Sequence, residues 1–232
     1  MPGKYLAVLV LLVIATIGFA LACVILRRKG KSFEGMLCKF MASFGFISIS
    51  VFGNFSNNPD ISFFSFVLVA LMFSFFGDVL LGIKEIAPTF KKKLIPLGMG
   101  YFLVAHIFSL LAFTEIAGFK WYLPVIAAAG GIIMFILCFV LPVKAGTGFK
   151  AVISVYYSFL VWKLATAARM LILAQTRANI VIFTAALLFI ISDTCLGLLY
   201  FTPVKRKNVL VTAELSTYYP AQILLAMSVL FV

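Results

Sequence analysis

Apolar residues in this chain come in long runs separated by short polar segments. Each run has about the 20 residues that a helix needs to cross the hydrocarbon core of a bilayer. One polar segment, residues 53–60, is rich in asparagine and is predicted to be a turn-rich loop. We expect an all-α fold, a polytopic transmembrane helical bundle of about eight spans, forming a single integral membrane domain over residues 1–232. The expected spans are residues 5–26, 35–52, 61–83, 94–113, 121–141, 151–173, 180–201 and 209–231.

Lysine and arginine gather in every second segment between these spans. Thirteen of the 19 lie there, four lie on the other side, and Lys39 and Lys163 fall within spans. Because basic residues are retained on the cytosolic side, these segments are predicted to be cytosolic and both termini non-cytosolic, in a cell membrane or, in a eukaryote, the endoplasmic reticulum. The thirteen are Arg27, Arg28, Lys29, Lys31, Lys84, Lys91, Lys92, Lys93, Lys144, Lys150, Lys205, Arg206 and Lys207.

The composition excludes several classes of protein. The chain is 64% hydrophobic and only 11% charged, whereas a soluble domain has roughly a quarter charged residues. The net charge of +12 could suggest a nucleic-acid partner, but the position of the basic residues between spans is better explained by membrane topology, so none is expected. One histidine and four cysteines without a C-x-x-C pair give no pattern for a metal site, and no cofactor is expected.

Two aspartates stand inside the apolar runs. Asp78 and Asp193 share the pattern small-Asp-x-x-Leu-Gly, at residues 77–82 and 192–197. A carboxylate within a membrane span is costly and usually functional, although each could instead be a polar clamp between helices. Their spans run in the same direction, so the pattern could also mark a parallel duplication of a four-helix unit, about residues 1–115 and 120–232.

Other polar residues fall within the same spans, most of them in the half nearer the cytosol by helix rise. Tyr218 and Gln222 are four residues apart and therefore share a helix face. Lys39 could meet a lipid phosphate or simply extend to the interface. The remaining candidates are His106, Tyr156 and Lys163, and for Lys163 the sequence does not decide between pairing with an acid and reaching the interface.

Four segments of the chain, in this order and spacing, resemble the lysoplasmalogenase-like (YhhN) family of polytopic membrane proteins. The similarity extends over most of the chain from the second expected span onward. Two positions depart from the family pattern, since Lys39 lacks a following proline and Pro220 replaces a small residue. Glu214 falls outside the similar segments and is left out of the expected site. The segments are residues 73–78 (FSFFGD), 100–106 (GYFLVAH), 187–193 (LLFIISD) and 216–222 (STYYPAQ).

The resemblance implies a hydrolase that cleaves the vinyl ether bond of lysoplasmalogens, with a lysophospholipid substrate and membrane lipid as its partners. The products would be a fatty aldehyde and glycerophosphoethanolamine or glycerophosphocholine. A vinyl ether opens by protonation, and two carboxylates can divide the work of proton donor and cation stabiliser, as in glycoside cleavage. We therefore expect Asp78 and Asp193 to face one cavity as the catalytic pair, on neighbouring spans.

In this hypothesis His106 assists catalysis by orienting an acid or moving a proton. Lys39, Tyr156, Tyr218 and Gln222 would bind the substrate. The main alternative is a transporter of small molecules or ions that uses the membrane aspartates to carry protons or cations. A purely structural membrane protein is a further alternative, and it predicts that both aspartates tolerate replacement by asparagine.

Overall fold

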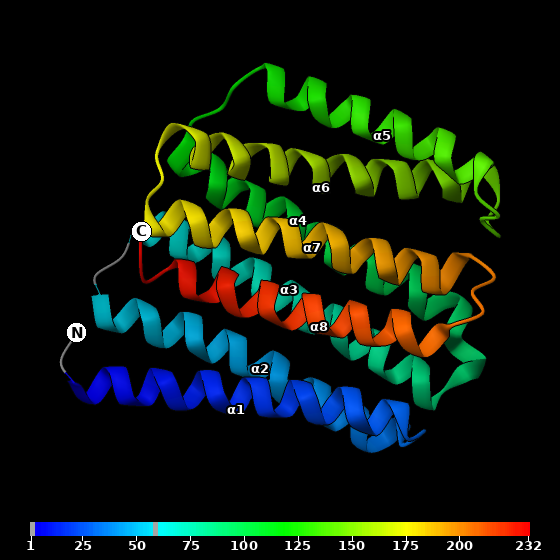
Figure 1. Ribbon diagram of the computed structural model, residues 1–232, viewed down its shortest axis with the longest axis horizontal. Helices are drawn as coiled ribbons and strands as arrows, with labels where there is room; N and C mark the ends of the chain where they lie inside the picture. Colours follow the sequence, from blue (N-terminus) through cyan, green and yellow to red (C-terminus); the bar gives the residue numbers. More distant parts are fainter. Residues whose placement is uncertain (1–2, 58–59) are drawn as a thin grey trace. The chain divides into compact units, whose positions relative to one another are not determined.

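The computed structural model describes residues 3–57 and 60–232, and within them the chain is all-helical (Figure 1). The predicted fold class is therefore confirmed. A short 3-10 turn, η1 (Pro88–Phe90), precedes the fourth helix. The α-helices are α1 (Gly3–Arg28), α2 (Ser32–Asn57), α3 (Ile61–Ile86), α4 (Lys91–Ala117), α5 (Tyr122–Val140), α6 (Thr147–Leu173), α7 (Arg177–Phe201) and α8 (Lys207–Ser228).

The helices start and stop at recognisable signals. The Asp60 side chain accepts hydrogen bonds from the amides of Ser62 and Phe63 and so caps α3. The Thr176 hydroxyl does the same for α7 through the amide of Asn179. The chain turns after α1 and α4 at Gly30 and Gly118, which have φ angles of 75° and 67°, a conformation that costs glycine little.

Several helices extend beyond the apolar runs that predicted them. The loop expected at residues 53–60 is wrong for residues 53–57, which continue α2, while residues 58–59 lie outside the described residues. Polar residues near a membrane surface can remain helical because the helix satisfies its own backbone hydrogen bonds. Helix α3 likewise continues past residue 83 to Ile86, so Lys84 belongs to a helix and not to a loop.

The fold divides into two compact units. The first contains the chain up to Ala112 together with Gln222–Val232. In it, α2 packs against α1 and α3, which lie on either side of it (Figure 1). Helices α1 and α2 approach closely at Gly45, where an added Cβ would collide with the Thr16 side chain. The Phe102 ring of α4 lies against Gly77 of α3 in the same way, so small residues set the spacing of these helices.

The second unit, Phe113–Ala221, packs consecutive helices in the same order. Helix α6 lies against α5 and α7 (Figure 1). A Cβ added at Gly131 of α5 would collide with Ser158 of α6. In each unit the aspartate stands on the third helix of such a row, α3 or α7. The predicted parallel duplication stays a prediction, with this common order as an argument in its favour.

Among the described residues, seven helices are long and apolar enough to span a membrane, and α8 is not one of them. The chain is thus a multi-pass membrane protein, and its eight described α-helices, seven of which meet this criterion, agree with the expected bundle of about eight spans. Helix α8 is long enough but carries polar residues along much of its length, including Glu214 and Gln222, which are buried. A helix enclosed by protein does not need the apolar surface that lipid demands.

Whether α8 crosses the membrane decides on which side of it the C-terminus lies. A helix of 22 residues is about 33 Å long at 1.5 Å per residue, which exceeds a hydrocarbon core of about 30 Å. We therefore expect a reporter fused after Val232 to be on the non-cytosolic side, like the N-terminus. A cytosolic signal from that reporter, with fusions in the 91–93 segment as the cytosolic reference, would mean that α8 does not cross.

Candidate functional site

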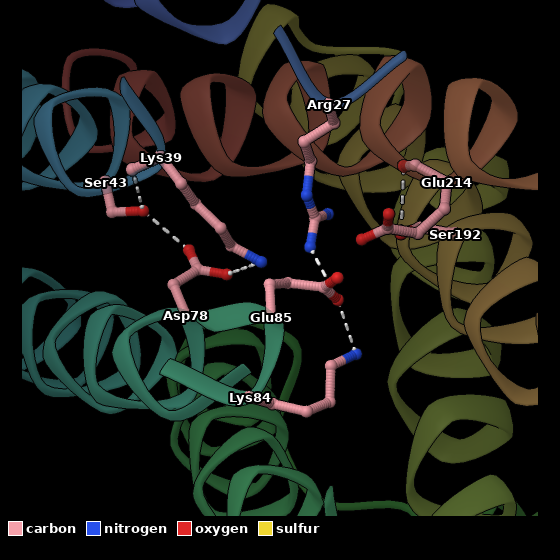
Figure 2. Close-up of polar contacts among 8 residues, drawn as sticks. All are labelled: Arg27, Lys39, Ser43, Asp78, Lys84, Glu85, Ser192 and Glu214. Atoms are coloured by element: carbon pink, nitrogen blue, oxygen red, sulfur yellow. Dashed lines mark hydrogen bonds and ion pairs between the residues drawn. The ribbon is translucent and has the colours of Figure 1, made fainter. Parts of the chain in front are cut away.

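In the first unit both oxygens of the Asp78 carboxylate contact side chains of α2. The Lys39 ammonium lies 2.9 Å from Oδ1, and the Ser43 hydroxyl donates to Oδ2 at 2.6 Å (Figure 2). Lys39 and Ser43 are one helical turn apart, so they project from one face of α2. The three side chains are at most 3% exposed. Lys39 and Asp78 therefore form a buried ion pair.

The depths of these residues explain the pairing. Asp78 lies eight residues before the end of α3 at Ile86, and Lys39 lies seven residues after the start of α2 at Ser32. At 1.5 Å per residue both are about 10–12 Å from the same end of the helix pair. A charge held at this depth requires a partner of opposite sign, and the antiparallel register of α2 and α3 provides one.

A second set of charges lies at the end of α1 and α3, and we call Arg27, Lys84 and Glu85 the terminal triad. One oxygen of Glu85, Oε1, is 3.0 Å from an Arg27 guanidinium nitrogen and 2.8 Å from the Lys84 ammonium (Figure 2). Glu85 stands seven residues after Asp78, two turns along the same face of α3. The charge of Glu85 also interacts with that of Lys39. The triad and the Asp78 pair therefore form one electrostatic network.

In the second unit Asp193 accepts a hydrogen bond from a tyrosine. The Tyr156 hydroxyl of α6 donates to Oδ2 of Asp193 on α7 at 2.7 Å. Asp193 lies eight residues before the end of α7 at Phe201, the same separation as that of Asp78 from the end of α3. Both aspartates are thus about 12 Å from the ends of their helices, and each meets a polar side chain of the preceding helix.

Lys163 of α6 lies beside this contact. Its ammonium is 3.9 Å from the centroid of the Phe189 ring, in a cation–π arrangement, and its charge interacts with that of Asp193. Lys163 is two turns from Tyr156, and Phe189 is one turn from Asp193, so one face of α6 meets one face of α7. The Tyr218 ring contacts Phe189 edge-on at 6.3 Å between centroids. Three of the predicted residues, Tyr156, Asp193 and Tyr218, therefore gather around α7.

The other predicted residues lie elsewhere. His106 is buried on α4, fifteen residues after the start of that helix at Lys91, and is therefore about 10 Å deeper than Asp78 by helix rise. Gln222 is buried in the part of α8 that belongs to the first unit. Asp78 belongs to the first unit and Asp193 to the second, so their shared cavity and the adjacency of their spans stay predictions.

Metal ligands do not gather among the residues that the structure describes. In residues 3–57 and 60–232, no group of three His, Cys, Asp or Glu side chains could hold a metal ion. The polar clusters combine a carboxylate with hydroxyl and ammonium groups, which suits proton transfer and charge stabilisation.

Sequence reasoning missed Ser43 and the terminal triad. Ser43 stands one turn after Lys39, and this spacing on a helix could have marked it as a partner of the same group. Lys84 was counted among the loop charges because the apolar run ends at residue 83. The spacing of seven between Asp78 and Glu85 was the available signal that both acids share a face.

Comparison with known proteins supports one family. The family model of the YhhN family matches residues 35–229, a range that contains both aspartates and all the other predicted site residues. It begins inside α2, so α1 and Arg27 lie before it. The chain matches none of the curated proteins and none of the solved structures with which it was compared.

Proposed function

The chain belongs to the YhhN family, a family that includes lysoplasmalogenases, and on this premise we propose that it hydrolyses the vinyl ether bond of lysoplasmalogens within the membrane. The observation that carries the proposal is the family match over residues 35–229. The setting of the two aspartates supports it. Each is an acid about 12 Å from a helix end, where the linkage of a lysolipid lies beneath its head group.

The reaction needs an acid, a water molecule and a means of stabilising a cation. A proton is added to the outer carbon of the vinyl group, which leaves an oxocarbenium ion on the carbon next to oxygen. Water adds to that carbon and gives up a proton, forming a hemiacetal. The hemiacetal then breaks its bond to the glycerol oxygen, which takes a proton, and releases the aldehyde. Water is the only co-reactant, so the chemistry requires general acid–base groups and no redox partner.

The contacts suggest how the two aspartates divide these steps. Asp78 lies 2.9 Å from the Lys39 ammonium and forms a buried ion pair with it. We assign Asp78 to stabilise the oxocarbenium ion and to direct the water. Oδ2 of Asp193 accepts a hydrogen bond from the Tyr156 hydroxyl, and we assign Asp193 to deliver the proton from its other oxygen. Lys39 then serves chiefly as the counter-ion of Asp78, and less as a phosphate ligand.

The remaining residues have supporting roles in this proposal. Ser43 and Tyr156 hold the two carboxylates in position through bonds of 2.6 and 2.7 Å. Tyr218 and Gln222 are assigned to contact the substrate from α8, and His106 to assist proton movement deeper in the first unit. The alkenyl chain would lie between apolar helix faces rich in phenylalanine. No cofactor is needed for any step.

A panel of lysolipids that differ only at the sn-1 linkage tests this function. We expect the purified protein to release aldehyde from the vinyl ether and to leave the alkyl ether and the ester intact, because only the vinyl ether forms an oxocarbenium ion on protonation. Aldehyde release is measured by mass spectrometry, with protein carrying Asp193→Asn as the background control.

Two results would contradict the proposal. Hydrolysis of the ester at a comparable rate would indicate an acyl hydrolase. No turnover of any linkage, combined with proton or cation flux in proteoliposomes, would favour the transporter.

A further inference from the structure

We propose that the first unit binds anionic phospholipids of the surrounding leaflet through a basic rim, at the end where α1 and α3 finish and α2 and α4 begin. The first three residues of the rim lie at the junction of α1 and α2, and the last three form the start of α4. The partner is a membrane lipid with a negatively charged head group, so the inference goes beyond the proposed function and does not depend on it. The basic rim consists of Arg28, Lys29, Lys31, Lys91, Lys92 and Lys93.

Packing within the first unit brings the two halves of the basic rim to one end. At the start of α2, a Cβ added to Gly35 would lie 3.0 Å from the Arg27 side chain at the end of α1. The Arg27 guanidinium in turn contacts Glu85 at the end of α3. Near the start of α4, a Cβ added to Gly98 would lie 3.0 Å from Leu81 of α3. The ends of α1 and α3 and the starts of α2 and α4 therefore lie together, and the six cations share this end.

The basic rim is accessible and carries a large excess of positive charge. Its five lysines are exposed, and Arg28 is half-buried. Two acids lie at the same end, Glu34 in the first turn of α2 and Glu85 near the end of α3. Even when both are counted against the rim, six cations less two acids leave an excess of four positive charges. A cluster of this size beside a membrane span is typical of a surface that binds anionic lipid.

Exposed apolar side chains indicate that the charges meet a membrane and not a soluble anion. Phe33, two residues after Lys31, is 56% exposed, and Phe90, directly before Lys91, is 59% exposed. Aromatic side chains in such positions enter the boundary between head groups and acyl chains. The stem of a neighbouring lysine can follow the apolar surface while its ammonium reaches a lipid phosphate. A phospholipid therefore fits both the charges and the apolar residues, whereas a soluble anion would fit only the charges.

Membrane topology alone does not account for the form of the basic rim. The positive-inside rule depends on how many basic residues lie on each side of the membrane, and it does not require three lysines in succession on a helix. Residues 91–93 are the first turn of α4, which contains no acid. Cations in the first turn oppose the helix dipole, and a lipid anion beside them offsets this cost.

The test measures which lipids stay with the protein. Purified protein is reconstituted in bilayers of phosphatidylcholine with a minor share of phosphatidylglycerol and extracted in mild detergent, and the retained lipids are quantified by mass spectrometry. We expect phosphatidylglycerol to be enriched about fivefold over its share of the bilayer, the effect of one lysine at an anionic surface. Lys91→Gln, Lys92→Gln and Lys93→Gln together should lower the enrichment by about twofold or more, because half of the basic rim is removed.

Two variants are the controls. Arginine at the same three positions keeps the charge and should keep the enrichment. Lys120→Gln with Arg177→Gln removes two exposed cations at helix ends that are predicted to be non-cytosolic, and it should leave the enrichment unchanged. Should the glutamine triple variant fail to fold, Lys29→Gln with Lys31→Gln is measured in its place, with a decrease expected for the same reason.

Three results would overturn the proposal. The first is no enrichment in the wild type, or an equal enrichment in the glutamine variants. The second is an equal decrease in the Lys120→Gln, Arg177→Gln variant. The third concerns added inorganic phosphate, which should lower the enrichment no more than chloride at the same ionic strength, so a stronger effect of phosphate would indicate a site for the soluble ion. Because no lysolipid is present, these results are independent of whether the protein hydrolyses a vinyl ether.

Discussion

Replacing Asp193 by asparagine should lower the turnover of the vinyl ether substrate by about a hundredfold or more, the scale of general acid catalysis. Asparagine keeps the shape of the side chain and can still accept the bond that Tyr156 donates at 2.7 Å, but it has no acidic proton to deliver. Turnover is measured as initial aldehyde release at saturating substrate. Tyr156→Phe removes only the positioning bond and should lower turnover less, by about tenfold.

The control for this prediction is Glu115→Gln, which removes an exposed carboxylate of α4 and should leave turnover unchanged. Asp78→Asn should also lose about a hundredfold or more, but it leaves the Lys39 ammonium facing a neutral amide. The same substitution is therefore also made in the Lys39→Met protein. Near-normal turnover in both Asp193→Asn and Asp78→Asn would reject the two-aspartate mechanism.

Lys39→Met should destabilise the protein by about 3–5 kcal/mol, the cost of removing one partner of a buried ion pair. Asp78 is fully buried, and without the ammonium 2.9 Å away its charge has lost its nearest compensation. The measurement is thermal unfolding of the purified protein in detergent, where a decrease in Tm on the order of 10 °C is expected. Lys31→Met, at an exposed position before α2, is the control.

The double variant Lys39→Met with Asp78→Leu distinguishes a loss of stability caused by the unpaired charge from one caused by poorer packing. Because it removes both charges and leaves apolar groups of similar size, we expect it to recover most of the lost stability. It should nevertheless be inactive, since Asp78 is gone. A Lys39→Met protein whose Tm is within about 2 °C of that of the wild type would contradict a contribution of the Lys39–Asp78 pair to stability.

Much of the fold was predictable because the membrane imposes a simple rule. A span must be helical and about 20 residues long, so the apolar runs located every helix, including α3 and α7 with their aspartates. The rule predicts the ends of the helices less well. Residues 53–57, which include a glycine and two asparagines, and Lys84 were assigned to loops, although the helices α2 and α3 continue through them.

The candidate site was only partly predictable. Asp78 and Asp193 were visible because an acid in an apolar run is rare. Their partners were harder to find, because the contact of Lys39 with Asp78 depends on the register between α2 and α3. Ser43 was missed because a serine in a helix usually bonds its own backbone, and its bond to Asp78 depends on that same register.

Helix α8 shows a further limit of the sequence. Its length predicted a span, but its polar residues make its composition fall short of one, and three of them, Glu214, Gln222 and Ser228, are buried. Apolar runs mark helices whose surfaces contact lipid, whereas a helix enclosed by protein does not need an apolar surface. The crossing of α8 therefore has to be tested by the reporter at Val232.

The position of α1 has an evolutionary consequence. Helix α1 supplies Arg27 to the terminal triad, yet it precedes residues 35–229, the part that the family model matches. On the proposed assignments, the groups that break the bond lie in the matched part, whereas the ion pair that joins α1 to α3 has one partner outside it. Substitutions in α1 can then alter the surroundings of Glu85 while the proposed bond-breaking groups are inherited intact.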